Sequence, residues 1–236
     1  MRIRLDRLIA SQGPWSRKEV KKLIKAGRVR VGDRLARRPE EKVDPEAEPV
    51  FLDGEPLFYR RHLHLLLHKP PGVLSATRDR EEAVALDLVP EALWRRELGI
   101  AGRLDKDAEG LLFLTTDGEL AHRLTHPRWK VGKVYEVDLD APVGEAEVRA
   151  FAQGVAGFRP ARLEPLPGAR ARVTIEEGKH HQVKRMFRAV GREVKRLVRT
   201  RLGPLELGPL APGEVRELTP EEIDELYRAV GLEEAD

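Results

Sequence analysis

Apolar and polar positions in the first part of the chain follow a helical spacing and then an alternating one. One apolar stripe runs through "LDRLIASQG", and a second runs through "SRKEVKKLIKAG". Ser16 and Glu19 have the spacing of a capping box, and Gly27 stands where the second helix would end. "RVRVGDRLA" then alternates as a strand, a turn and a strand. This pattern predicts two short helices followed by a β-hairpin.

Strand-like and helix-like patterns both continue through the remaining residues. We expect strands in "LHLLLHK", "GLLFLTT", "KVYEVDLD", "RARVTI" and "REVKRLVRTRLGPLEL". Helices are expected around residues 86–98, from Asp117 onward, and in "GEAEVRAFAQG", "HQVKRMFRAVG" and "TPEEIDELYRAVG", the last with Thr219 as its N-cap. Because strands do not alternate strictly with crossover helices, the pattern predicts an α+β domain with a mixed, largely antiparallel sheet flanked by helices.

A change of composition separates these two parts of the chain. The stretch "PEEKVDPEAEPVFLDGEPL" is acidic and contains proline. We therefore predict a small N-terminal domain over residues 1–58, a linker over residues 59–62 and a larger domain over residues 63–236.

The composition narrows the class of protein. Of the 236 residues, 41% are hydrophobic and 35% are charged, as in a folded globular protein rather than a disordered one. The absence of cysteine excludes disulfides and thiolate zinc sites. No apolar run is long enough to span a bilayer, and the N-terminus lacks a signal-peptide core. We therefore expect a cytoplasmic protein with no membrane partner. The absence of asparagine and the heavy charge are typical of thermophile proteins.

Positive and negative charges are segregated along the chain, although the net charge is only +3. Residues 1–38 contain thirteen Lys and Arg against three Asp and Glu, and residues 170–201 contain eleven against three. Residues 202–236 contain two against ten. Two concentrated basic stretches favour a nucleic-acid partner, because a merely solvated surface would mix the two signs more evenly.

One segment presents a candidate catalytic carboxylate. In "GRLDKDAEGLLFLTTDG", a Gly–Arg–Leu–Asp turn precedes an apolar strand, which would hold Asp105 at a loop tip with Arg103 and Asp107 beside it. An aspartate in a surface turn is more often structural than catalytic. The residues alone therefore make Asp105 a candidate and no more.

Three further segments carry polar clusters. "EEGKHHQVKRMF" leads into a helix start, where phosphate binds readily, and Lys184 and Arg185 there could pair with a carboxylate. A solvated basic helix would explain its apolar positions but not the polar cluster at the turn. "HKPPGVLS" ends a strand at Lys69 before a rigid turn. In "KVYEV", we expect Tyr135 on the opposite strand face from both Val134 and Val137, with its ring either packed or stacked on a base.

Histidines at helical or strand spacing give weak evidence of a metal site. His122 and His126 are four residues apart, but no third ligand is evident. His62, His64 and His68 alternate along a strand. We expect no metal site and no cofactor.

Taken together, these segments resemble a known family. "RLDRLIA", "SRKEVKKLIKAGRVRVGDRLA" and "DGEPL" resemble the S4 RNA-binding domain. The four polar segments, in this order, resemble the pseudouridine synthases that carry an N-terminal S4 domain. "EGKHHQVKRMF" and "LAPGEVRELTPEEI" resemble its small-subunit rRNA branch, the RsuA family. Large-subunit branches more often have Asn-Arg in place of His180 and His181.

The resemblance implies roles for individual residues. Asp105 would be the essential carboxylate, Arg103 would hold the opened RNA, and Tyr135 would stack on the target base. Lys184 would pair with Asp105, and Leu202 would line the pocket. Many relatives have Thr or Ser near Asp107-Ala108. Further residues expected to contact RNA are Lys69, Gln182, Arg185, Arg17, Lys18, Lys21 and Arg28.

The resemblance also implies a reaction and a partner. Uridine would be cut from its sugar, turned and rejoined through carbon, with Asp105 either attacking C1′ or removing a sugar proton. We expect a monomer that modifies 16S rRNA, and we expect a partly assembled small subunit to be a better substrate than naked RNA. Alternatives are a synthase for 23S rRNA and a non-catalytic S4-domain ribosome-binding factor. An S4-bearing methyltransferase is disfavoured because the chain has no G-x-G-x-x-G loop.

Overall fold

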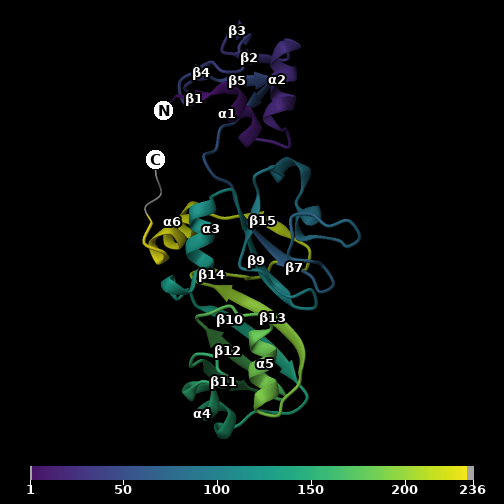
Figure 1. Cartoon of the computed structure of the whole chain (residues 1–236), viewed down its shortest axis with the longest axis vertical. Coiled ribbons are helices and arrows are strands. Elements are labelled where there is room, and N and C mark those ends of the chain that lie inside the picture. Colours follow the sequence, from purple (N-terminus) through teal and green to yellow (C-terminus); the bar gives the residue numbers. More distant parts are fainter. Residues whose placement is uncertain (1, 233–236) are drawn as a thin grey trace. The chain divides into compact units, whose positions relative to one another are not determined.

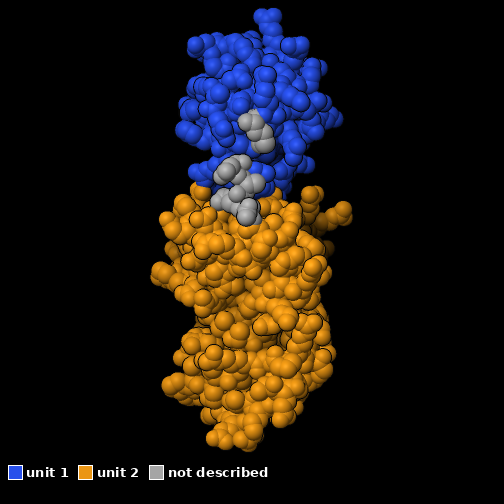
Figure 2. Space-filling view, turned by 90° about the vertical axis from the view of Figure 1, so that its left-hand side faces the viewer, with its two compact units in different colours: residues 1–63, 89–98 blue, residues 64–88, 99–236 orange. Residues whose placement is uncertain are grey.

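The computed structural model describes residues 2–232. Met1 and residues 233–236, which the predicted domain bounds include, lie outside the described range. The chain divides into two compact units, shown in different colours in Figure 2. The first contains residues 1–63 and 89–98, and the second contains residues 64–88 and 99–236. No helix of the described residues has the length and apolar character needed to cross a bilayer.

The first unit contains the two predicted helices and the predicted hairpin (Figure 1). Its helices are α1 (Leu5–Ser11) and α2 (Arg17–Lys25). Its strands are β1 (Ile3–Arg4), β2 (Val29–Val31), β3 (Arg34–Leu35), β4 (Lys42–Val43), β5 (Val50–Leu52) and β6 (Glu55–Leu57). The capping box of Ser16 and Glu19 is present at the start of α2, and Gly27 follows that helix with a positive φ of 74°. Apolar residues from both helices and from β2, β4 and β5 form one buried cluster.

The second unit is built on a nine-stranded sheet with the order β11-β12-β10-β13-β9-β7-β15, in which β14 pairs with β13 and β8 with β9. Its strands are β7 (His64–Lys69), β8 (Gly99–Ala101), β9 (Glu109–Thr115), β10 (Lys133–Leu139), β11 (Arg162–Leu166), β12 (Arg170–Ile175), β13 (Val194–Leu202), β14 (Leu205–Glu206) and β15 (Val215–Glu217). All the pairings are antiparallel except β9 with β13. The predicted mixed, largely antiparallel α+β fold is confirmed.

Four α-helices and two short 3₁₀ segments belong to the second unit. They are η1 (Ala85–Leu88), α3 (Gly118–Thr125), η3 (Pro127–Trp129), α4 (Glu145–Gln153), α5 (Gln182–Ala189) and α6 (Pro220–Ala229). The predicted cap at Thr219 is confirmed, because Thr219 forms a capping box with Glu222 at α6. Helix α3 begins near Asp117 as expected, and the Asp117 side chain caps it.

The helix predicted around residues 86–98 is wrong. Two short 3₁₀ segments, η1 and η2 (Glu91–Leu93), stand in its place and are separated by Pro90. Proline has no N–H to donate and disfavours helical backbone in the residue before it, here Val89. The leucine content therefore indicated burial but not a continuous helix.

Candidate active site

Asp105 lies on the loop between β8 and β9, and a buried lysine forms hydrogen bonds with the backbone of that loop. Lys69, at the end of β7, is 0% exposed. Its ammonium donates to the carbonyl oxygens of Lys106 at 3.1 Å, Ala108 at 2.7 Å and Pro70 at 2.8 Å. Two of these carbonyls belong to the three residues after Asp105, so Lys69 fixes the backbone on that side of the carboxylate.

The other side of the loop is fixed by Arg199 and Ser75. Arg199, on β13, is 1% exposed and donates to the carbonyl of Gly102 at 2.6 Å and to that of Leu111 at 2.8 Å. The Ser75 hydroxyl donates to the Leu104 carbonyl at 2.8 Å and accepts from the Leu104 N–H at 3.0 Å. The backbone is thus hydrogen-bonded on both sides of Asp105, which limits how far its carboxylate can move.

A glycine allows β9 to approach β13 beside this loop. Gly110 has a φ of 108° and pairs with Arg199 in the parallel ladder. A Cβ atom at this position would lie 2.3 Å from the Arg199 carbonyl oxygen. Only glycine fits, both because of the positive φ and because of the close backbone.

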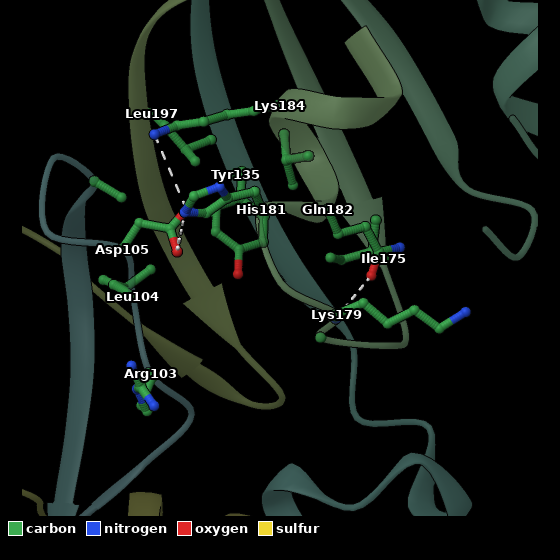
Figure 3. Close-up of a pocket in the computed structure, with 13 residues that line it drawn as sticks. Arg103, Leu104, Asp105, Tyr135, Ile175, Lys179, His181, Gln182, Lys184 and Leu197 are labelled. Carbon is green, nitrogen blue, oxygen red and sulfur yellow. Dashed lines mark hydrogen bonds and ion pairs between the residues drawn. The ribbon is translucent and has the colours of Figure 1, made fainter. Parts of the chain in front are cut away.

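Two basic side chains from the start of α5 face the Asp105 carboxylate (Figure 3). His181 Nε2 lies 3.6 Å from Asp105 Oδ1, and Lys184 Nζ lies 4.0 Å from Asp105 Oδ2. Lys184 contacts Asp107 more closely, at 2.6 Å from Oδ1. That hydrogen bond outweighs burial and holds the pKa of Asp107 below its usual value. Lys184 therefore joins both carboxylates of the loop, with the shorter bond to Asp107.

Asp105 borders a pocket, which we call the Tyr135 pocket. Its apolar wall includes Tyr135 of β10, Ile175 of β12 and Leu197 of β13, all of them buried. Tyr135 is 7% exposed. Its polar rim comes from the Asp105 loop and the start of α5. The pocket therefore offers a flat apolar surface next to a carboxylate.

The expected orientation of Tyr135 is only half right. Tyr135 and Val137 share the buried face of β10, whereas Val134 lies on the other face. Residues two apart on a strand point to the same side, so the predicted opposition of Tyr135 and Val137 is wrong.

A second hollow, of about 470 Å³, adjoins the first, and we call it the His180 basin. It is lined by the Asp105 loop, by His180 and His181, and by Pro71, Gly72, Leu74, Ser75 and Ala76. Arg103, Leu104, Asp105 and His181 line both hollows. Asp105 therefore stands on a common rim.

Comparison with known proteins places this arrangement in a family. A profile of RNA pseudouridylate synthases matches residues 63–189, and a profile of the S4 domain matches residues 3–48. The chain belongs to the RNA pseudouridylate synthase family. It is 45% identical to an uncharacterized RNA pseudouridine synthase of Aquifex aeolicus, over 97% of this chain and 98% of the relative. It is 40% identical to the ribosomal small subunit pseudouridine synthase A of Escherichia coli strain K12, over 94% and 98%.

A solved structure agrees with the sequence comparisons. The crystal structure of a pseudouridylate synthase superposes with a TM-score of 0.66 and 33% identity, covering 96% of this chain and 99% of that one. This similarity extends through both the S4 domain and the larger domain. The resemblance found in the sequence motifs is therefore confirmed at the level of the family and the fold.

Several predicted site residues of this synthase lie together. Arg103, Asp105, Tyr135, Gln182 and Lys184 all line the Tyr135 pocket. Gln182 is buried, and its amide donates to Glu177 at 2.9 Å, so it also fixes the turn before α5. Arg185 is exposed and lies over the ring of Phe158 at 4.8 Å instead of lining the pocket.

Two of the residues expected to contact RNA are enclosed by the protein. Lys69 is completely enclosed and its ammonium is occupied by three carbonyls, so it supports the loop instead of touching a ligand. Leu202 is 1% exposed and packs in a core cluster with Phe113 and Leu205. The apolar residue of β13 that lines the pocket is Leu197, five positions earlier.

The basic residues predicted in the S4 domain differ in their availability. Lys18 and Lys21 are exposed on α2. Arg17 donates to the buried carboxylate of Asp6 at 3.1 Å, and Arg28 pairs with Asp53 at 2.6 Å. The guanidinium groups of these two arginines thus take part in structural ion pairs.

The histidine pair considered for metal binding lies in an aromatic cluster. The rings of His122 and His126 lie 5.2 Å apart and both approach Trp129. Within residues 2–232, no group of three or more His, Cys, Asp or Glu side chains has the arrangement of a metal site.

Proposed function

We propose that this synthase converts a uridine of ribosomal RNA to pseudouridine, with Asp105 as its catalytic carboxylate. The observation that carries the proposal is the position of Asp105. It stands on the rim of the Tyr135 pocket, with His181 and Lys184 within 4.0 Å of its oxygens. Relatives named as ribosomal small subunit pseudouridine synthases, in Escherichia coli and Pseudomonas aeruginosa, support ribosomal RNA as the substrate.

The isomerisation exchanges one bond for another without a redox step. The N1–C1′ bond of uridine breaks, a C5–C1′ bond forms, the C5 proton leaves and N1 gains a proton. Asp105 either adds to C1′ or removes a proton from the sugar to give a glycal. Both routes need a carboxylate held beside the sugar, and the hydrogen bonds of Lys69, Arg199 and Ser75 to the loop provide that placement.

The other pocket residues would act on the detached base. Tyr135 forms an apolar wall on which a pyrimidine ring can stack while it turns, and its hydroxyl can assist removal of the C5 proton. Lys184 would hold the Asp105 side chain in place through its ion pairs with Asp105 and Asp107. Turning a base out of folded RNA costs about a few kcal/mol, and contacts to phosphates would offset that cost.

The central test is the replacement of Asp105. We expect Asp105→Asn to abolish pseudouridine formation while RNA binding and folding persist, because the amide keeps the shape but cannot act as a nucleophile or base. Tritium release from RNA labelled at uridine C5 measures the reaction. The matched control is Asp138→Asn, which changes a partly exposed aspartate on the face of β10 opposite to Tyr135. Substantial turnover by Asp105→Asn would disprove the assigned role.

We further propose that the target uridine lies in 16S rRNA, and that a partly assembled small subunit is a better substrate than naked RNA. The motifs "HHQVKRM" and "LAPGEVRELTPEEI" and the names of the relatives support this choice. RNA sites are recognised largely by shape and folded context. Pseudouridines should be mapped in both ribosomal subunits after deletion of the gene. Loss of a site in 23S rRNA, with 16S rRNA unchanged, would show that the target lies in the large subunit.

A further inference from the structure

The His180 basin has no role in the reaction described so far. It adjoins the Tyr135 pocket at Asp105, and the two hollows share only the rim residues Arg103, Leu104, Asp105 and His181. Its volume of about 470 Å³ lies within the roughly 300–1,000 Å³ range of ligand sites. A ligand that reaches Asp105 therefore meets space on two sides.

The covalent structure of a nucleotide implies that the two hollows hold different parts of the RNA. If the sugar of the target uridine lies at Asp105, its base extends from C1′ in one direction and its phosphates extend from C3′ and C5′ in others. The Tyr135 pocket, with its buried apolar wall, suits the base. The RNA backbone must then leave across the rim, and a neighbouring nucleotide comes within reach of the His180 basin.

A stacked pair of histidine rings forms one wall of this basin. The rings of His180 and His181 lie 3.7 Å apart with an interplanar angle of 23°. Both residues are exposed, and His180 lines the basin without lining the Tyr135 pocket. Stacking covers one face of each ring, so the other face of His180 is free for a further aromatic ring.

The rest of the lining suits a nucleobase and its phosphate. Pro71, Leu74 and Ala76 give the basin an apolar side. Arg103 is exposed at its edge and makes no ion pair with any residue in the range 2–232, so its guanidinium is available to a phosphate. Aromatic side chains and arginine are the groups on which single-stranded bases stack.

We propose that the His180 basin binds the nucleobase directly adjacent to the target uridine in the same RNA strand. His180 stacks on that base, and Arg103 contacts the phosphate between the two nucleotides. This inference rests on the proposed function, because it assumes that the uridine sugar lies at Asp105. It assigns His180 a part in sequence context, separate from the chemistry at the rim.

The test uses an RNA fragment that contains the mapped target uridine, and two versions with an abasic residue directly 5′ or directly 3′ of it. For the wild-type protein, removal of one of these bases should lower kcat/KM about tenfold, the loss expected for one stacked base. For His180→Ala the same removal should have little further effect, whereas His180→Phe should keep the full discrimination. His122→Ala, an exposed histidine on α3 that lines neither hollow, is the control and should discriminate like the wild type.

The outcomes separate this inference from the proposed function. If deletion of the gene removes no pseudouridine from ribosomal RNA, the proposed function fails. If the wild type is active but His180→Ala loses the same factor as the wild type on both abasic fragments, the function stands and the subsite is wrong. Binding of the three fragments to Asp105→Asn, measured without turnover, should show the same loss and would confirm that the effect is on affinity.

Discussion

Two buried cations, Lys69 and Arg199, hold the loop of Asp105, and Lys69 should make the stability of the protein depend on pH. Burial lowers the pKa of Lys69 from 10.5 to about 8, against the pull of the nearby carboxylates of Asp107, Asp105 and Glu109. Between about pH 8 and 10.5, Lys69 is therefore protonated to a greater extent in the unfolded chain than in the folded chain. The contribution of Lys69 to the free energy of unfolding therefore rises with pH across this window.

We expect Lys69→Met to remove this contribution. The difference in free energy of unfolding between wild type and variant should shift in favour of the wild type by up to about 1.4 kcal/mol per pH unit between about pH 8 and 10. Urea denaturation at several pH values measures the difference. Turnover should also fall, because three hydrogen bonds to the loop are lost. A difference that stays constant with pH would contradict the assigned burial.

Lys184 offers a second prediction at the same scale. Its hydrogen bond is the main cause of the low pKa of Asp107. In Lys184→Met the pKa of Asp107 should rise, and turnover should fall by about tenfold or more. NMR titration of the side-chain carboxyl carbons measures the first effect. An unchanged titration of Asp107 would show that Lys184 does not hold this pair in solution.

The sequence predicted the polar residues that line the site better than the buried residues that hold the Asp105 loop. Asp105, Tyr135 and Lys184 lie in motifs whose order is informative, and they meet at one pocket. Arg199 could not be selected, because "RLVRTRL" contains several arginines and only tertiary packing buries this one. The burial of Lys69 and Leu202 could not be predicted for the same reason, because it depends on tertiary packing and not on the local sequence.

Among the elements, α5 is the one whose packing most directly positions the site. It places Lys184 toward Asp105 while Val183, Met186 and Phe187 are buried on its other side. Phe187 is 0% exposed, and its ring lies 5.0 Å from that of Phe151 on α4. The register of the helix therefore depends on an apolar contact between two helices.

Phe187→Ala should lower the free energy of unfolding by about 3–5 kcal/mol, because it leaves a cavity in a closely packed region. Arg188→Ala, the adjacent exposed position, should change it by about 0.5 kcal/mol or less. Chemical denaturation measures both. Equal effects of the two substitutions would contradict the packing of α5.

Local rules predicted the elements well where caps or a clear period were present. Ser16, Asp117 and Thr219 each begin a helix as expected. The helix expected at residues 86–98 is absent because Pro90 interrupts this leucine-rich segment. Local sequence patterns also could not predict the pairing of β9 with β13. This pairing depends on a close approach between the backbones of Gly110 and Arg199, which are more than eighty positions apart in the sequence.

At the scale of the whole molecule, removal of residues 1–58 should leave a folded protein that binds ribosomal RNA weakly. The removed part contains the exposed lysines of α2, and each lost phosphate contact should reduce the slope of log Kd against log salt by about 0.7–0.9. Residues 89–98 group with the first unit, where the Arg96 N–H donates to the Gly13 carbonyl, so some loss of stability should accompany the truncation.

Titration of fluorescent rRNA fragments at several salt concentrations measures this effect. Lys18→Gln combined with Lys21→Gln in the intact chain is the matched variant, because it removes two charges without removing the unit. Its salt slope should lie between those of the wild type and the truncated protein. Equal affinities of all three proteins would remove the proposed role of the S4 domain in RNA binding.

The hydrogen bond from Arg199 to Gly102 joins positions 97 residues apart, which sets an order of events during synthesis. Ribosomes add roughly 5–20 residues per second, so the loop with Asp105 emerges several seconds before β13. During that interval the carbonyls of Gly102 and Leu111 lack the guanidinium that orders them, and Gly110 lacks its parallel partner. The site is therefore incomplete until most of the chain has been made. During all of that time the nascent chain is attached to a ribosome, and ribosomal RNA is its proposed substrate.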